Sequence, residues 1–203
     1  MRNAVVLASN NAGKLGELRA LLAQVGLDLI SQGELGVSAA EETGATFVEN
    51  ALLKARHAAR ASGRAALADD SGLEVDWLHG APGAHSARFA GADADDARNN
   101  QKLLTLLRDV PAARRGARFR CILVYVDSAT DPAPLICEGV WEGHILEQSR
   151  GTHGFGYDPL FLIPELGRTA AELTASEKNA LSHRGRALRM LLTKLRPRVA
   201  ARC

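Results

Sequence analysis

Two acids, a serine and a glycine stand together at Asp69-Asp70-Ser71-Gly72, directly after a short apolar run. This order indicates a strand that delivers carboxylates into a tight turn. Successive strand residues face opposite sides of a sheet, so both acids can face one ligand only if the chain turns there. We expect one acid to face a site and the other to stabilise the turn. A merely solvated turn has the same composition and is the alternative.

A second polar group suits phosphate oxygens. Residues 9–14 follow an expected buried strand over 4–8 and open a helix with a leucine-rich face. Backbone N–H groups at the helix start and the Lys14 ammonium would meet an anion. The segment is not a Walker A loop, because Ala8 replaces the first glycine and Leu15 the Ser or Thr. A plain strand-to-helix connection is the alternative.

Glycines and aromatic residues alternate in the segment 151–159. Glycine lets the backbone approach a ligand closely. Phe155 and Tyr157 offer flat faces and Asp158 offers an acceptor, a combination that suits a purine ring. A glycine-rich hairpin end is the alternative.

The predicted elements must position these groups. Strands over 4–8 and 27–30 flank the first helix as a β-α-β unit, which predicts a partly parallel sheet. A capping box of Thr46 and Glu49 opens a helix over 47–62 that carries Lys54. Strands over 119–126 and 135–146 are expected to form an antiparallel pair, which could be a separate lobe.

The C-terminal third predicts short helices. Thr-x-x-Glu signatures begin at Thr169 and Thr174, and Ser182 is the natural N-cap of a last helix. Its first turn carries His183 and Arg184, where an arginine opposes the helix dipole. Such local conflicts tend to mark functional positions.

Composition sets further bounds. The 203 residues fit one domain, and 46% hydrophobic residues can fill a sizeable core. A formal charge of +2 and 4% aromatic residues argue against a nucleic-acid partner. The apolar run 4–8 is too short for a signal peptide or membrane span, and Cys121, Cys137 and Cys203 have no CxxC spacing, so we expect a cytoplasmic protein without membrane contact.

The six histidines form no zinc-binding spacing, and no GxSxG elbow is present. No nucleophile is paired with a base, so activated water is the simplest attacker. A nucleoside triphosphate with a metal ion would use the available groups. These are the cations Lys14, Lys54, Lys178 and Arg184, the carboxylate of Asp70, and the aromatic glycine loop.

Six segments together resemble the inosine triphosphate pyrophosphatase family, with the bacterial dITP/XTP pyrophosphatases as the nearest match. They occur in the family's order and run from about residue 5 to about residue 195. The segments are Ser9-Asn10-Asn11-Ala12-Gly13-Lys14, Thr46 to Ala51, Ala68 to Leu73, Gly80-Ala81-Pro82-Gly83 with Ser86-Ala87-Arg88, Gly154 to Pro159, and Ser182-His183-Arg184-Gly185. Gly16 departs from the pattern, since the family often has a charged residue there.

The resemblance implies a homodimeric, Mg²⁺-dependent enzyme that removes ITP, dITP and XTP by cleaving between the α- and β-phosphates. It implies an α/β fold, a single domain over 1–203 with a long mixed sheet flanked by helices, and two lobes around a nucleotide cleft. The base would be chosen by donors such as His183 or Arg184, which suit a 6-oxo purine.

The resemblance also assigns roles by position. Asp70 would be the catalytic base and a Mg²⁺ ligand, with Glu42 as a second ligand. By the alternation argument, Asp69 would support the turn, although a shared metal role stays open. The substrate-binding residues would be Ser9, Asn10, Asn11, Ala12, Gly13, Lys14, Lys54, Ser71, Phe155, Gly156, Tyr157, Asp158, Lys178, His183 and Arg184.

Two other functions use similar residues. A non-catalytic purine-nucleotide-binding module could have the same phosphate loop and aromatic loop without needing Asp70. A Maf-like pyrophosphatase acting on pyrimidine nucleotides would differ in its base preference.

Overall fold

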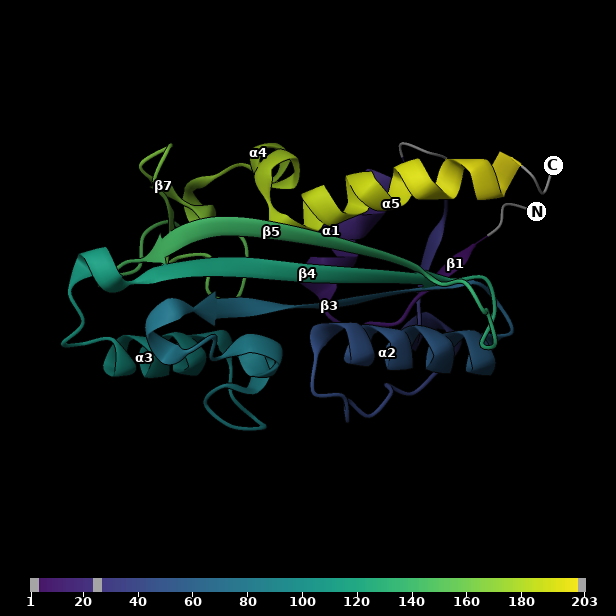
Figure 1. Ribbon diagram of the computed structural model, residues 1–203, viewed down its shortest axis with the longest axis horizontal. Coiled ribbons are helices and arrows are strands. Elements are labelled where there is room, and N and C mark those ends of the chain that lie inside the picture. Colours follow the sequence, from purple (N-terminus) through teal and green to yellow (C-terminus); the bar gives the residue numbers. More distant parts are fainter. Residues whose placement is uncertain (1–3, 24–26, 201–203) are drawn as a thin grey trace. The chain divides into compact units, whose positions relative to one another are not determined.

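The computed structural model describes residues 4–23 and 27–200, so Cys203 lies outside the described residues. Within these ranges, seven strands form one open sheet in the order β2-β1-β3-β4-β5-β6-β7 (Figure 1). The strands are β1 Val5–Leu7, β2 Leu29–Ser31, β3 Ala66–Val75, β4 Gly116–Val126, β5 Leu135–Ile145, β6 Phe161–Ile163 and β7 Arg168–Thr169. β1 is parallel to β2 and β3, whereas β6 is antiparallel to β5 and β7. The predicted mixed sheet flanked by helices is confirmed.

The helices begin where the capping signals predict. The α-helices are α1 Ala12–Leu22, α2 Phe47–Ser62, α3 Asp96–Leu106, α4 Ala175–Leu181 and α5 His183–Ala200. Short 3-10 helices cover Gly33–Leu35, Asp76–Leu78, Gly83–Arg88, Ala112–Arg114 and Ala170–Glu172. The three capping boxes expected at Thr46, Thr169 and Thr174 are all present. No helix in the described ranges combines the length and the apolar content needed to cross a bilayer.

The described residues divide into two compact units. Unit 1 comprises the residues up to Asp70, Cys121–Gly139 and those from Arg184 onward, and unit 2 comprises Ser71–Arg120 and Val140–His183. The boundary falls within β3, β4 and β5, so each of these strands contributes to both units. β4 and β5 therefore do not form a separate lobe, contrary to the expectation. The predicted nucleotide cleft stays a prediction.

In unit 1, helices cover both faces of the sheet. α1 and α5 lie against one face and α2 against the other (Figure 1). Leucines of α1 and α5 pack on strand residues in one buried cluster, which includes Leu18, Leu22, Leu188, Leu191, Leu7, Leu67, Cys121 and Leu123. The buried face of α2 is made of small side chains, Ala51, Ala55, Ala58 and Ala59. Small residues let this helix lie close to the sheet and bring Lys54 near the strands.

Unit 2 has its own apolar core. Leu103 of α3 and Leu107, the C-cap residue of this helix, belong to the same buried cluster as Phe119, Trp141 and Phe161. The Trp141 ring lies 5.3 Å from the Phe161 ring, centroid to centroid. Trp141 is thus a packing residue.

Candidate active site

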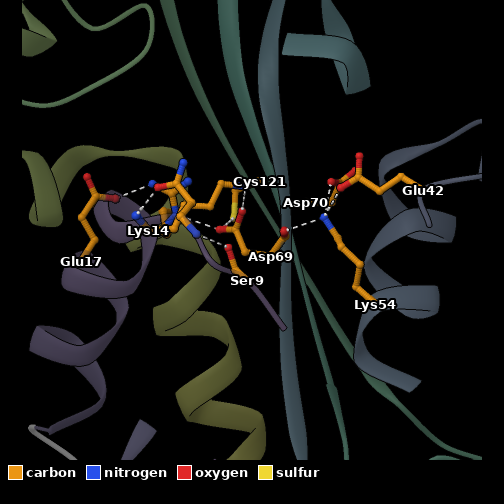
Figure 2. A network of polar contacts seen from close by, with 10 residues as sticks. Ser9, Lys14, Glu17, Glu42, Lys54, Asp69, Asp70 and Cys121 are labelled. Atoms are coloured by element: carbon orange, nitrogen blue, oxygen red, sulfur yellow. Dashed lines mark hydrogen bonds and ion pairs between the residues drawn. The ribbon is translucent and has the colours of Figure 1, made fainter. Parts of the chain in front are cut away.

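The strand β3 does not turn at the paired acids. It continues as regular strand from Ala66 to Val75, so the predicted tight turn at Asp69-Asp70 is wrong. β3 lies between β1 and β4 in the sheet, and β4 provides ladder partners beyond the end of the short β1. Strand alternation therefore decides the geometry, and the two carboxylates point to opposite sides of β3 (Figure 2).

Asp69 is the centre of a buried charge cluster. Its Oδ1 lies 2.5 Å from Lys14 Nζ, and its Oδ2 accepts a hydrogen bond from Arg184 Nε over 2.7 Å. Burial by itself raises the pKa of the Asp69 carboxyl, but the charges and hydrogen bonds of Arg184 and Lys14 hold that pKa well below its usual value. Cys121 Sγ lies 3.4 Å from Asp69 Oδ2. Asp69 is therefore a counter-ion that orients two cations, not a support of a turn.

Lys14 belongs to the predicted phosphate loop, whose shape is fixed locally. Asn11 is the N-cap of α1 and its Oδ1 accepts from Lys14 N over 2.9 Å. Ser9 Oγ accepts from Asn11 N over 3.2 Å. The first turn of α1 contains no acidic residue. The loop thus presents a helix N-terminus and one ammonium, which together favour an anion.

Asp70 forms a second cluster on the other side of β3. Its Oδ1 accepts from Lys54 Nζ over 2.6 Å, and Lys54 Nζ also donates to Glu42 Oε1 and to the Asp69 carbonyl, each over 3.0 Å. Burial raises the pKa of Asp70, against the lowering effect of Lys54. Burial also lowers the pKa of Lys54, but Asp70 and Glu42 together raise it above its usual value. Lys54 therefore stays a cation.

One oxygen of this cluster has no hydrogen-bond partner among the described residues. Asp70 Oδ2 is buried and accepts no hydrogen bond from the part of the chain that the structure describes. Buried carboxylate oxygens are nearly always satisfied, so an exception points to a water, an ion or a substrate group. The oxygen is thus available for chemistry while its neighbour Oδ1 is held by Lys54.

Glu42 reaches this cluster from the loop before α2. Asn50 is buried on α2, and its Oδ1 accepts from Gly44 N over 2.8 Å. A Cβ at Gly44 would lie 2.6 Å from Glu49 Cβ and 2.7 Å from Asn50 Oδ1. Only glycine allows this close approach of the loop to the helix. Asn50 thus holds the loop that carries Glu42.

The carboxylates of this cluster suit a hard cation that takes only a few of its ligands from the protein. No group of three or more His, Cys, Asp or Glu side chains within 4–23 and 27–200 could hold a metal by itself. Mg²⁺ commonly uses only one or two carboxylates and takes its other oxygens from water and substrate phosphates. Glu42 and Asp70 supply two such carboxylates, and Oδ2 of Asp70 accepts no hydrogen bond from the described residues.

In unit 2, the aromatic glycine loop is tied to α4. Asp158 Oδ2 accepts from Phe155 N over 2.9 Å and lies 2.5 Å from Lys178 Nζ, and both charged side chains are buried. Lys178 Nζ also lies 4.7 Å from the centroid of the Phe155 ring. Asp158 thus fixes the loop and its neighbouring lysine, while the half-buried Phe155 ring remains accessible in part.

Two rings that were expected to contact the substrate, those of Tyr157 and His183, are buried in the structure. Tyr157 is buried in the core of unit 2, and its hydroxyl donates to the Ser86 carbonyl over 2.9 Å. The expectation that Tyr157 offers a flat face to a base is therefore wrong. His183 is also buried and stacks on Phe119, with ring centroids 4.9 Å apart.

The structure groups the candidate residues within the units as follows. Unit 1 contains Ser9, Asn10, Asn11, Ala12, Gly13, Lys14, Glu42, Lys54, Asp70 and Arg184, and unit 2 contains Ser71, Phe155, Gly156, Tyr157, Asp158, Lys178 and His183. Asn10 is exposed and Ser71 half-buried.

Glu17 was missed by the sequence reasoning. It lies one turn after Lys14 on α1 and forms an ion pair with Arg184 Nη1. Burial lowers the pKa of Arg184, but Asp69 and Glu17 raise it above its usual value. The i, i+3 spacing from Lys14 was the available sign, since it places both side chains on one helix face.

Comparisons with known proteins cover nearly the whole chain. A protein-family model described as the Ham1 family matches residues 5–194. The dITP/XTP pyrophosphatase of Pectobacterium atrosepticum is 61% identical over 192 residues, which cover 95% of this chain and 98% of that protein. The dITP/XTP pyrophosphatase of Escherichia coli O157:H7 is 60% identical over the same shares of the two chains.

Solved structures agree. A HAM1 protein from Coxiella burnetii matches with a TM-score of 0.88 at 51% identity, over 97% of this chain and 100% of that one. A nucleoside-triphosphatase / dITP/XTP pyrophosphatase from Mycobacterium abscessus matches with a TM-score of 0.73 at 45% identity, over 93% and 98% of the two chains.

Proposed function

The chain belongs to the Ham1 family, and from that premise we propose that it hydrolyses ITP, dITP and XTP to the nucleoside monophosphate and pyrophosphate. Such an enzyme keeps deaminated purines out of DNA and RNA. The resemblance to the inosine triphosphate pyrophosphatases that the motifs predicted is confirmed by the family match. The relatives favour neither a non-catalytic module nor a pyrimidine-specific enzyme.

The proposal rests on the different surroundings of the two carboxylate oxygens of Asp70. Lys54 holds Oδ1 at 2.6 Å, while the buried Oδ2 has no hydrogen-bond partner among the described residues. A carboxylate that is fixed through one oxygen can orient a water molecule with the other and take its proton. Its raised pKa makes it a stronger base than an ordinary aspartate.

Cations of unit 1 would bind the triphosphate. Lys14 and the N-terminus of α1 suit its phosphate oxygens, and Lys54 suits the charge that develops as the anhydride bond breaks. Asp69, whose Oδ1 lies 2.5 Å from Lys14 Nζ, would orient this ammonium. Ser9, Asn10, Asn11, Ala12 and Gly13 would shape the loop around the phosphates, and Ser71 would contact the substrate beside Asp70.

A divalent cation completes the site in this proposal. Glu42 and Asp70 would hold Mg²⁺, which when bound supplies charge neutralisation at the phosphate oxygens. Lys54 Nζ lies between the two carboxylates, 3.0 Å from Glu42 Oε1 and 2.6 Å from Asp70 Oδ1. Lys54 therefore also limits the repulsion between the two acids.

Residues of unit 2 would bind the base. The Phe155 ring would stack on the purine, with Gly156 and Asp158 shaping the loop around it. Lys178, whose Nζ lies 4.7 Å from the centroid of the Phe155 ring, and the buried His183 would supply the hydrogen-bond donors. A 6-oxo group accepts hydrogen bonds, whereas the amino group of adenine donates. The hydrogen-bond donors of such a site would therefore have no acceptor at this position of the adenine in ATP. Arg184 is expected to contribute through Asp69 and Glu17, which bind its guanidinium.

The oligomeric state, the cellular location and the partners of the protein are also proposals. We expect a homodimer in the cytoplasm that binds neither nucleic acid nor membrane, in line with the net charge of +2.

Product analysis tests the function most directly. The purified protein is incubated with Mg²⁺ and, separately, with ITP, dITP, XTP, GTP and ATP. We expect IMP and pyrophosphate from ITP, little turnover of ATP or GTP, and loss of activity with a chelator that Mg²⁺ restores. IDP and orthophosphate would place the cleavage at the other anhydride bond, and tight ITP binding without turnover would favour the non-catalytic module.

A further inference from the structure

Both backbone groups of Gly156 are bound by side chains of α3. The Gly156 N–H donates to Asp96 Oδ2 over 2.6 Å, and the Gly156 carbonyl accepts from Asn100 Nδ2 over 2.9 Å. Asp96 and Asn100 are one helical turn apart and so share a face of α3. All three residues belong to unit 2, and Asp96 and Asn100 are not among the residues that the proposed function uses.

Two carboxylates hold the peptide groups on either side of Phe155. The amide that follows Phe155 is bound by Asp96, and the amide that precedes it is bound by Asp158 Oδ2 over 2.9 Å. A residue whose two flanking peptides are both held has a fixed Cα–Cβ direction. The Cα–Cβ direction of Phe155, from which its ring extends, is thus set by two carboxylates, one inside the loop and one on α3.

The usual role of an acid at a helix start is already filled by Asp95. It is the N-cap of α3, and its Oδ1 accepts from Arg98 N over 2.8 Å. Asp96 has the first position inside the helix and directs its carboxylate to the loop. A role in capping therefore does not account for its contact with Gly156.

The amide of Asn100 has a similarly specific use. Its Oδ1 is buried and lacks a hydrogen-bond partner within the residues that the structure describes. A leucine at this half-buried position would avoid that unsatisfied oxygen. The bond from Nδ2 to Gly156 is therefore the contact that the amide group provides.

Gly156 itself would not hold this conformation without help. Its φ is +63° and the neighbouring Gly154 has φ +78°, and glycine visits many other backbone conformations at little cost. A loop with two such glycines around Phe155 needs external contacts to keep one geometry.

We propose that Asp96 and Asn100 are positioning residues that hold the loop Gly154–Asp158 in the conformation in which Phe155 meets the purine base. The inference rests on the proposed function, because the base is assigned to Phe155 there. Neither residue touches the substrate; both act through Gly156. Loss of either contact loosens the ring and weakens base binding in the ground state and the transition state alike.

Steady-state kinetics with ITP test this. Asp96→Ala is expected to raise KM about tenfold and Asn100→Ala about fivefold, because charged hydrogen bonds are the stronger ones. We expect kcat to stay within about twofold, the pattern of lost uniform binding. Asp96→Asn keeps an acceptor oxygen and should recover part of the loss. Asp95→Asn removes a charge from the same helix end but keeps the cap, and Gln101→Ala truncates an exposed neighbour; both should behave as the wild type.

Two measurements without turnover accompany the kinetics. Amide hydrogen exchange should be faster at Gly156 in Asp96→Ala than in the wild type, while the melting temperature stays close to the wild-type value. The Kd for ITP in the presence of a chelator should rise together with KM. If the wild-type protein does not hydrolyse ITP, the proposed function fails, and exchange and Kd still decide the positioning role.

The inference is overturned if both alanine variants keep the wild-type KM and Kd, even when exchange is faster. It is also overturned if KM rises while exchange at Gly156 is unchanged, because the residues would then act elsewhere. A fall in kcat at constant KM contradicts it as well.

Discussion

Arg184 Nε donates to Asp69 Oδ2 over 2.7 Å, although 115 residues separate the two in the chain. The bond links the first turn of α5 to the middle of β3, and both side chains are buried. An arginine at a helix start opposes the helix dipole, but here Asp69 and Glu17 compensate its charge. The local conflict in the sequence is therefore resolved by tertiary contacts.

Replacing Asp69 by asparagine should strongly destabilise the protein. The change leaves the buried Arg184 and the largely buried Lys14 without their common counter-ion. Breaking a buried ion pair from one side costs about 3–5 kcal/mol of unfolding free energy. Urea unfolding of the metal-free protein at pH 7 measures the loss. A variant as stable as the wild type would show that Asp69 does not compensate these cations.

The same carboxylate should make stability depend on pH on the acid side. The pKa of Asp69 is lower in the folded state than in the unfolded chain. Its contribution is therefore present above the unfolded pKa of about 3.9 and is lost as pH falls toward the folded pKa. Urea unfolding is measured between pH 6 and pH 3, roughly the window that brackets this value. The free energy of unfolding should decline less steeply with falling pH for Asp69→Asn than for the wild type. Parallel curves for the two proteins would contradict this.

Asp70→Asn should separate activity from stability. The variant loses the general base, so kcat should fall by about 10²-fold or more. The folded-state pKa of Asp70 is raised, so stability falls as pH rises from the unfolded pKa through the folded pKa. At pH 7 the carboxylate thus lowers stability, and the neutral amide should match or exceed the wild type in thermal unfolding. ITP affinity should be largely retained; full turnover by the variant would remove Asp70 from the catalytic role.

Gly44→Ala should weaken metal binding without unfolding α2. The new Cβ would collide with Glu49 Cβ and Asn50 Oδ1, so the loop that carries Glu42 must move away from the helix. We expect the Mg²⁺ concentration for half-maximal activity to rise by roughly tenfold, the size of a lost supporting contact at a metal site. The helical circular dichroism should be unchanged. A normal Mg²⁺ requirement would mean that the position of Glu42 is not critical.

Gly16→Ala is the same substitution as Gly44→Ala at a position with free space, and it should raise the stability of the protein. Gly16 lies in α1, its φ is not in the left-handed region, and a Cβ there would meet no atom within 4 Å. Alanine should therefore stabilise the protein by up to about 1 kcal/mol through its higher helix propensity. Thermal unfolding measures the gain, and kcat and KM for ITP should not change. A destabilised variant would mean that the helix is strained at this position.

Local elements followed from the sequence alone. Capping boxes at Thr46 and Thr174 predicted the starts of α2 and α4, and the short motifs in their order predicted the phosphate loop and the family. The physical reason is range: a cap or a periodic apolar face is determined by residues within one or two turns.

Only the tertiary structure decided how these parts act on one another. Asp-Asp-Ser-Gly has the composition of a turn, but its neighbours in the sheet keep β3 extended, so Asp69 and Asp70 point to opposite sides and bind different lysines. Tyr157 looked available for a base because it stands beside glycines, yet the core of unit 2 buries it. The roles of Glu17 and Arg184 depended on the return of α5 to β3. Ladder partners, core packing and ion pairs between distant residues are properties of the folded chain, because no short window of sequence contains both members of such a contact.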